Sequence, residues 1–253
     1  MSLTRIDKAM NFGAFNRIVC TAAAAGILAG LFLTGVQKIQ VSPIILQAEV
    51  YEEAAATAHT QAAADEHEHG QQDQESHEYE HEHEHSHDAW QPENGAERTF
   101  FTALANISMA VGFGLLLAGA VCLRGNPGWR AGLLWGAAGY AVFFVAPSLG
   151  LPPEVPGTAA APLAARQLWW LTTVVATAGG LSLLVFPRAW ALKLVGAAVL
   201  CLPHLAGAPQ ALVQASAAPA ELARAFIYAT AFANAAFWLA LGGLSGYFYK
   251  KFA

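Results

Sequence analysis

Residues 101–123 read FTALANISMAVGFGLLLAGAVCL, an apolar run without a charged side chain. A helix needs about 20 apolar residues to cross the roughly 30 Å hydrocarbon core of a bilayer. The run is long enough and apolar enough to do so. It therefore predicts a transmembrane helix, and with it a membrane fold.

Five other stretches of the chain have the same character. The chain is 55% hydrophobic and only 12% charged, whereas soluble domains are about 25% charged. We expect an all-α fold, a polytopic membrane helical bundle with about six transmembrane helices. The predicted spans are Ile18–Val36, Phe101–Leu123, Ala131–Leu149, Leu168–Phe186, Trp190–Leu205 and Phe226–Tyr247.

The fifth of these spans is the weakest, because it is short, carries Lys193 and ends in Pro203-His204. Without it the chain would have five spans. Basic residues concentrate in cytoplasmic loops. Six spans with the N-terminus inside give the stronger bias, because they place nine of the 13 lysines and arginines on the cytoplasmic side and four on the other side. Six spans predict cytoplasmic N- and C-termini, with these basic residues inside: Arg5, Lys8, Arg17, Arg124, Arg130, Arg188, Lys193, Lys250 and Lys251.

Small residues recur one helical turn apart in three of the spans. Such pairs let helix backbones approach closely in lipid, where packing drives association. Together they favour a compact bundle. The pairs are Gly26 and Gly30, Gly132 and Gly136, and Gly242 and Gly246.

The acidic residues gather between the first two spans, where 15 of the 18 lie between Glu49 and Glu97. We divide the chain into a first segment and span (1–50), an extracytoplasmic His/Glu-rich loop (51–98) and a five-helix membrane bundle (99–253). A loop so poor in apolar residues is expected to be largely disordered. A short amphipathic helix at the membrane surface is predicted for Pro43–Glu53.

Eight of the nine histidines lie in this loop, and residues 80–87 read EHEHEHSH. Imidazole and carboxylate groups bind divalent transition metals, and a flexible ligand set would concentrate ions with little selectivity. The other interpretation is a solvated acidic linker whose histidines are incidental. The candidate metal ligands in the loop are His67, His69, His77, His81, His83, His85 and His87.

The same alternation produces the zinc-protease pattern H-E-x-x-H at residues 77–81, 81–85 and 83–87. That motif requires a packed helix with both histidines on one face. Here it arises three times from a simple repeat, and the chain has no P-loop or nucleophile elbow. We expect no enzymatic activity, no permanently bound cofactor and no nucleic-acid partner.

Near the ends of the spans, ionisable side chains are functional candidates because they are costly in lipid. His204 is the histidine outside the loop, and Pro203 would leave backbone carbonyls free beside its imidazole. Glu49 and Glu52 flank the outer end of the first span, where they could receive an ion from the loop. Glu154, among prolines, is a weaker candidate.

Two asparagines inside the spans, Asn106 and Asn234, have a different expected role. Amide side chains in membrane bundles commonly hydrogen-bond between helices. We therefore interpret both as links between neighbouring helices, with a place on an ion pathway as the alternative.

Four stretches together resemble the CbtA family of proposed cobalt transporter subunits. They are Gln37 with residues 41–52 (VSPIILQAEVYE), residues 151–154 (LPPE), residues 165–170 (ARQLWW) and residues 202–209 (LPHLAGAP). The resemblance covers nearly the whole chain. It implies cobalt uptake for cobalamin biosynthesis, a small single-span partner (CbtB) with its own histidine motif, and five spans where the residues predict six.

We therefore expect a bacterial inner-membrane subunit that takes up a divalent metal. Cobalt follows from the resemblance alone, since the residues would equally suit nickel or zinc. A non-transporting membrane metal-binding or sensor protein, presenting the loop to a partner, is the alternative; an inert membrane scaffold is a third interpretation.

Overall fold

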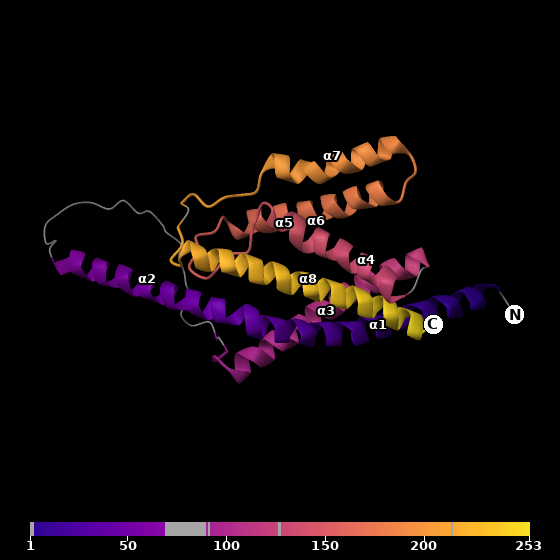
Figure 1. Ribbon diagram of the computed structural model, residues 1–253, viewed down its shortest axis with the longest axis horizontal. Helices are drawn as coiled ribbons and strands as arrows, with labels where there is room; N and C mark the ends of the chain where they lie inside the picture. Colours follow the sequence, from indigo (N-terminus) through magenta and orange to yellow (C-terminus); the bar gives the residue numbers. More distant parts are fainter. Residues whose placement is uncertain (1–2, 69–89, 91, 126–127, 214) are drawn as a thin grey trace.

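The computed structural model describes residues 3–68, 90, 92–125, 128–213 and 215–253. Within these residues the chain is built from helices and connecting segments, with no β-strand (Figure 1). The all-helical class predicted from the sequence is confirmed. The elements are α1 (Leu3–Gln40), α2 (Ser42–Glu68), α3 (Ala96–Arg124), α4 (Trp129–Tyr140), the π-helical turn η1 (Ala141–Val145), α5 (Ala146–Ser148), α6 (Leu163–Val185), α7 (Trp190–Ala206) and α8 (Ala220–Lys251).

Five segments are long and apolar enough to cross a membrane, and each contains one predicted span or nearly coincides with it. Each is longer than its predicted apolar core because the helix continues into its flanking polar residues. The third is continuous through α4, η1 and α5. The five segments are Phe12–Gln40, Ala96–Arg124, Trp129–Ser148, Leu163–Val185 and Ala220–Lys251.

The predicted fifth span is also a helix, α7, but it has only 17 residues. Its length is about 25 Å, slightly short of the hydrocarbon thickness. An isolated antiparallel bridge joins Thr158, before α6, to Ser216, after α7. The chain therefore leaves through α6 and returns through α7 to the same end of the bundle.

The apolar helices alternate in direction, so the molecule has two distinct ends (Figure 1). We call one the α2 end; it carries α2 and the starts of α3, α6 and α8. The opposite end, with the N- and C-termini, is called the terminal end. Basic side chains gather at the terminal end, among them Arg17, Arg124, Arg130, Lys250 and Lys251.

Helices α1 and α3 touch along Gly26 and Gly30, as the first small-residue pair predicted. A Cβ built on Gly26 would lie 2.7 Å from the Cα of Val111, and one on Gly30 would lie 2.6 Å from that of Ile107. No side chain fits in these gaps. The two backbones therefore pack at close range, which strengthens dispersion between them.

The other two pairs face each other across the α4–α8 contact. A Cβ on Gly242 would lie 2.7 Å from Gly136, and one on Gly246 would lie 3.0 Å from Gly132. The sequence predicted close packing from each pair separately. The structure reveals that these two pairs form one interface, with glycine opposed to glycine.

The main core lies between α1, α3 and α8. Ala25 and Ala29 are fully buried there against Phe237 and Leu241 of α8. The α6–α7 hairpin lies outside this core: α6 meets the rest of the described bundle through α5 and η1, and α7 packs on α6 alone.

The start of α2 is anchored by a second apolar cluster at the α2 end. Ala48 is buried against Val155, from the α5–α6 loop, and Ala218, just before α8. Pro43 sits in the first turn of α2, where proline is favoured because no hydrogen bond is lost.

Helix α2 corrects two expectations for the loop. The helix predicted at Pro43–Glu53 is present as its first part, but α2 is longer than predicted and extends away from the bundle (Figure 1). It also continues past Glu53 to Glu68, so the prediction of disorder was wrong for the loop's first residues. Alanine and glutamate, which favour helix, dominate that segment. At the loop's other end, Ala96–Arg98 already belong to α3, so the prediction was wrong there too. The prediction for residues 69–89 lies outside the described residues.

Candidate metal site at the α2 end

The predicted ligands divide between described and undescribed parts of the chain. Glu49 and Glu52 lie on α2, and His204 on α7, all at the α2 end. The backbone of His67 belongs to the last turn of α2, and its side chain lies outside the described residues. So do the other predicted loop ligands: His69, His77, His81, His83, His85 and His87.

Glu49 is held by Arg98, in the first turn of α3. Arg98 Nη2 donates to Glu49 Oε1 at 2.6 Å, and Nη1 donates to Oε2 at 3.1 Å. Arg98 Nη1 also donates to Asn94 Oδ1 at 2.7 Å. Both pairing side chains are about one third exposed, at 37% and 29%. A metal ion that bound Glu49 would therefore have to displace a guanidinium held in a two-bond fork.

The ion pair borders a polar pocket of about 400 Å³ between α1, α2 and α3. Lys38 also lines this pocket, and its Nζ donates to Thr99 Oγ1 at 2.7 Å. Glu49 offsets the charge of Arg98, so the ammonium of Lys38 is the charge in the pocket wall that repels a free cation in this conformation.

The deep side of the pocket is closed by a buried hydrogen-bond cluster between α1 and α3. Asn106, only 8% exposed, donates through Nδ2 to Thr34 Oγ1 at 3.0 Å and to Gln37 Oε1 at 2.7 Å. The predicted role of Asn106 as a link between helices is confirmed. The same prediction was wrong for Asn234, which donates to Thr230 O within α8.

The other two candidate carboxylates, Glu52 and Glu154, lie where α2 passes the α5–α6 loop. Glu52 is exposed, and its Cβ would lie 3.2 Å from a Cβ on Gly157, so α2 crosses the α5–α6 loop there. Glu154, in that loop, accepts from Arg166 at 2.9 Å. Of the three carboxylates, Glu49 and Glu154 are thus neutralised by arginines.

His204 is half-buried between α6 and α7. Its ring lies edge-on to Trp169, with centroids 6.0 Å apart. We predicted free carbonyls beside it, but the Pro203 carbonyl is engaged by Trp169 Nε1 at 3.3 Å and Gly207 N at 3.2 Å. Proline removes the bond to the carbonyl four residues before it, which is that of Val199 here. The contacts of Pro203 O do not test that carbonyl, so the expectation of a free carbonyl near His204 stays a prediction.

No group of three or more His, Cys, Asp or Glu side chains among the described residues is placed to hold a metal ion. The structure brings Glu49 and Glu52 together on α2, whereas His204 belongs to the α6–α7 hairpin.

Sequence reasoning used Lys38 and Arg98 only to count basic residues. Their position beside an acidic segment, at the polar ends of two apolar spans, is the signal that points to ion pairing. Such a signal does not identify the partner, which depends on how α2 packs on α3.

The comparisons with known proteins identify one family. The family model described as "Probable cobalt transporter subunit (CbtA)" matches residues 15–250. No curated protein matches the chain, and no solved structure does.

Proposed function

The chain belongs to the CbtA family of probable cobalt transporter subunits, and we propose that it carries cobalt across the bacterial inner membrane for cobalamin biosynthesis. The family match supports metal uptake directly. The cobalamin role, the membrane and the direction are parts of this proposal.

We propose that the His-rich loop collects ions and α2 leads them to the bundle. The observation that carries this proposal is the position of α2. It joins the histidine-rich residues, which begin at its C-terminal end, to Glu52 and then to Glu49, whose partner Arg98 lines the polar pocket. Exposed Glu52 would meet the ion before the paired Glu49.

The described conformation corresponds to a closed state in this scheme. The positive side chains of Lys38 and Arg98 line the pocket, and the apolar core of α1, α3 and α8 lies beyond it. Cobalt that binds Glu49 would release Arg98. The side-chain oxygens of Gln37 and Thr34 line the same pocket, and each would keep a lone pair for the ion beside the bond that it accepts from Asn106. Oxygen donors suit divalent first-row metals.

We propose a CbtB-type single-span subunit with a histidine motif as the partner. The word "subunit" in the family description implies a partner. The described residues alone offer no cluster of three ligands, so a partner imidazole would complete a set begun by Glu49, Glu52 or His204.

Radiolabelled cobalt uptake tests this function. Cells that lack the native protein should accumulate cobalt only when the chain and its partner subunit are restored. A tenfold excess of nickel or zinc, in parallel samples, measures selectivity. Cobalt bound to purified protein without accumulation in cells would instead support the metal-sensor alternative.

A further inference from the structure

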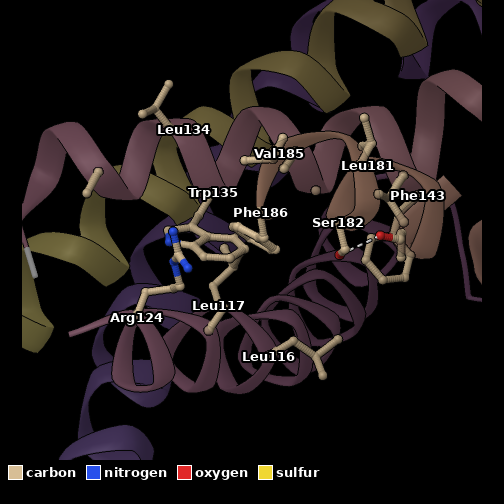
Figure 2. Close-up of a pocket in the computed structure, with 16 residues that line it drawn as sticks. Leu116, Leu117, Arg124, Leu134, Trp135, Phe143, Leu181, Ser182, Val185 and Phe186 are labelled. Carbon is tan, nitrogen blue, oxygen red and sulfur yellow. Dashed lines mark hydrogen bonds between the residues drawn. The ribbon is translucent and has the colours of Figure 1, made fainter. Parts of the chain in front are cut away.

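An apolar groove of about 740 Å³ lies between α3, α4, η1 and α6 (Figure 2). This volume falls within the range of sites that bind small ligands. The groove is far from the ligands discussed above, because it opens toward the terminal end.

The groove exists because the helices of the α6–α7 hairpin pack closely on the bundle only near the α2 end. There α6 packs on α5 and η1, and toward the terminal end it separates from α3 and α4. Small side chains keep the space open, notably Ala120 of α3, Ala138 of α4 and Ala178 of α6.

η1 shapes the α2 end of the groove. Ala146 N donates to Ala141 O, five residues back, and so widens one turn. Pro147 contributes to this irregularity, since it has no N–H to bond the carbonyl of Phe143. The turn directs Val142 and Phe143 toward the groove.

One charged residue lines the groove, at its opposite end. The guanidinium of Arg124 lies 4.3 Å from the ring centroid of Phe186, and Trp135 packs 6.4 Å from the same ring (Figure 2). Arg124 forms no ion pair with another described residue. Ser182, the other polar lining residue, donates its hydroxyl to Ala178 O.

We propose that this groove binds an anionic phospholipid, with an acyl chain along the apolar lining and the phosphate on Arg124. Charge complementarity selects this occupant: a long apolar cavity ends in one arginine at the level of the bundle's basic end. Basic pockets between transmembrane helices at that level suit acidic head groups. A second transmembrane helix would cover the apolar lining but would leave the guanidinium without an anion.

Native mass spectrometry of the detergent-purified full chain tests the proposal. The protein is titrated with phosphatidylglycerol and with phosphatidylcholine of identical acyl chains. Arg124→Ala should weaken phosphatidylglycerol binding about tenfold, the effect of losing one charge-assisted contact, and should weaken phosphatidylcholine binding by less, because choline offsets the charge of its phosphate. Arg124→Lys should keep much of the preference.

Arg130→Ala is the matched control, since Arg130 lies over Trp129 at the same end but does not line the groove. It should leave binding unchanged. Equal losses from Arg124→Ala and Arg130→Ala would overturn the proposal in favour of general surface charge. Thermal unfolding of each variant establishes that it is folded.

Ala178→Phe tests occupancy of the groove itself. The added ring should weaken both lipids, because it fills the path of the acyl chain. Brominated phosphatidylglycerol should also quench the fluorescence contributed by Trp135, measured as the difference from Trp135→Phe. Unchanged lipid binding by Ala178→Phe, or loss of a co-purified partner subunit instead, would overturn the proposal.

Discussion

Glu49 and Arg98 form a two-bond ion pair that fastens the beginning of α2 to the beginning of α3, with a shortest N–O distance of 2.6 Å. The pair borders the polar pocket between α1 and α3. It therefore controls whether the carboxylate of Glu49 is available to a metal ion.

The two halves of this pair should have opposite effects on cobalt uptake. Glu49→Gln removes the proposed ligand and should lower uptake several-fold at limiting cobalt. Arg98→Ala frees the carboxylate of Glu49 and should preserve or raise cobalt uptake. Either substitution costs about 1 kcal/mol of stability at this partly exposed position. Uptake assays with parallel thermal unfolding measure both effects. Equal losses of uptake would indicate a purely structural pair.

The His-rich loop should concentrate ions without selecting them. Replacing His77, His81, His83, His85 and His87 with alanine should raise the cobalt concentration for half-maximal uptake and leave the maximal rate nearly unchanged. The same effect should follow from lowering the pH toward about 6, because protonated imidazole does not bind cations. Loss of uptake at saturating cobalt would make the loop an obligatory part of the path.

His204→Ala should abolish uptake even at saturating cobalt, if the imidazole is a ligand on the path. The control is Trp169→Phe, at the residue whose ring packs against His204. This variant keeps the aromatic packing and removes the hydrogen bond to Pro203. Pro203→Ala should reduce uptake partly by restoring a regular helix. Normal uptake by inserted His204→Ala protein would leave Glu49, Glu52 and Glu154 as the candidates.

Gly242 and Gly243 are adjacent on α8 but should respond differently to alanine. A Cβ on Gly242 would lie 2.7 Å from Gly136, whereas one on Gly243 would lie 3.4 Å from the flexible side chain of Leu133. Overpacking typically costs about 1–3 kcal/mol. Gly242→Ala should therefore lower the thermal unfolding temperature, and Gly243→Ala should leave it nearly unchanged. Equal temperatures would exclude close α4–α8 packing in the membrane.

Topology reporters should separate the two ends of the bundle. Fusions at Asp88 and at Ala253 are expected on opposite sides of the membrane, with Ala253 cytoplasmic. Single cysteines at Thr158 and Ser216 should react with an impermeant thiol reagent on the Asp88 side, in a background without the native cysteines, because the two residues are bridged. Asp88 and Ala253 on one side would eliminate six spans.

The sequence by itself determined the apolar helices of the bundle. Apolar runs such as residues 101–123 leave no other way to satisfy backbone polar groups in lipid. The spacing of Gly26 and Gly30 also predicted a close helix contact. Each of these features is local, so it can be read without knowing the neighbours.

The tertiary structure alone decided which groups meet. Arg98 neutralises Glu49 because α2 packs beside the start of α3, and Trp169 engages Pro203 because α6 and α7 form a hairpin. The groove beside Arg124 arises from the separation of that hairpin from α3 and α4. These contacts depend on the relative placement of whole helices, which the spacing of residues along one helix does not specify.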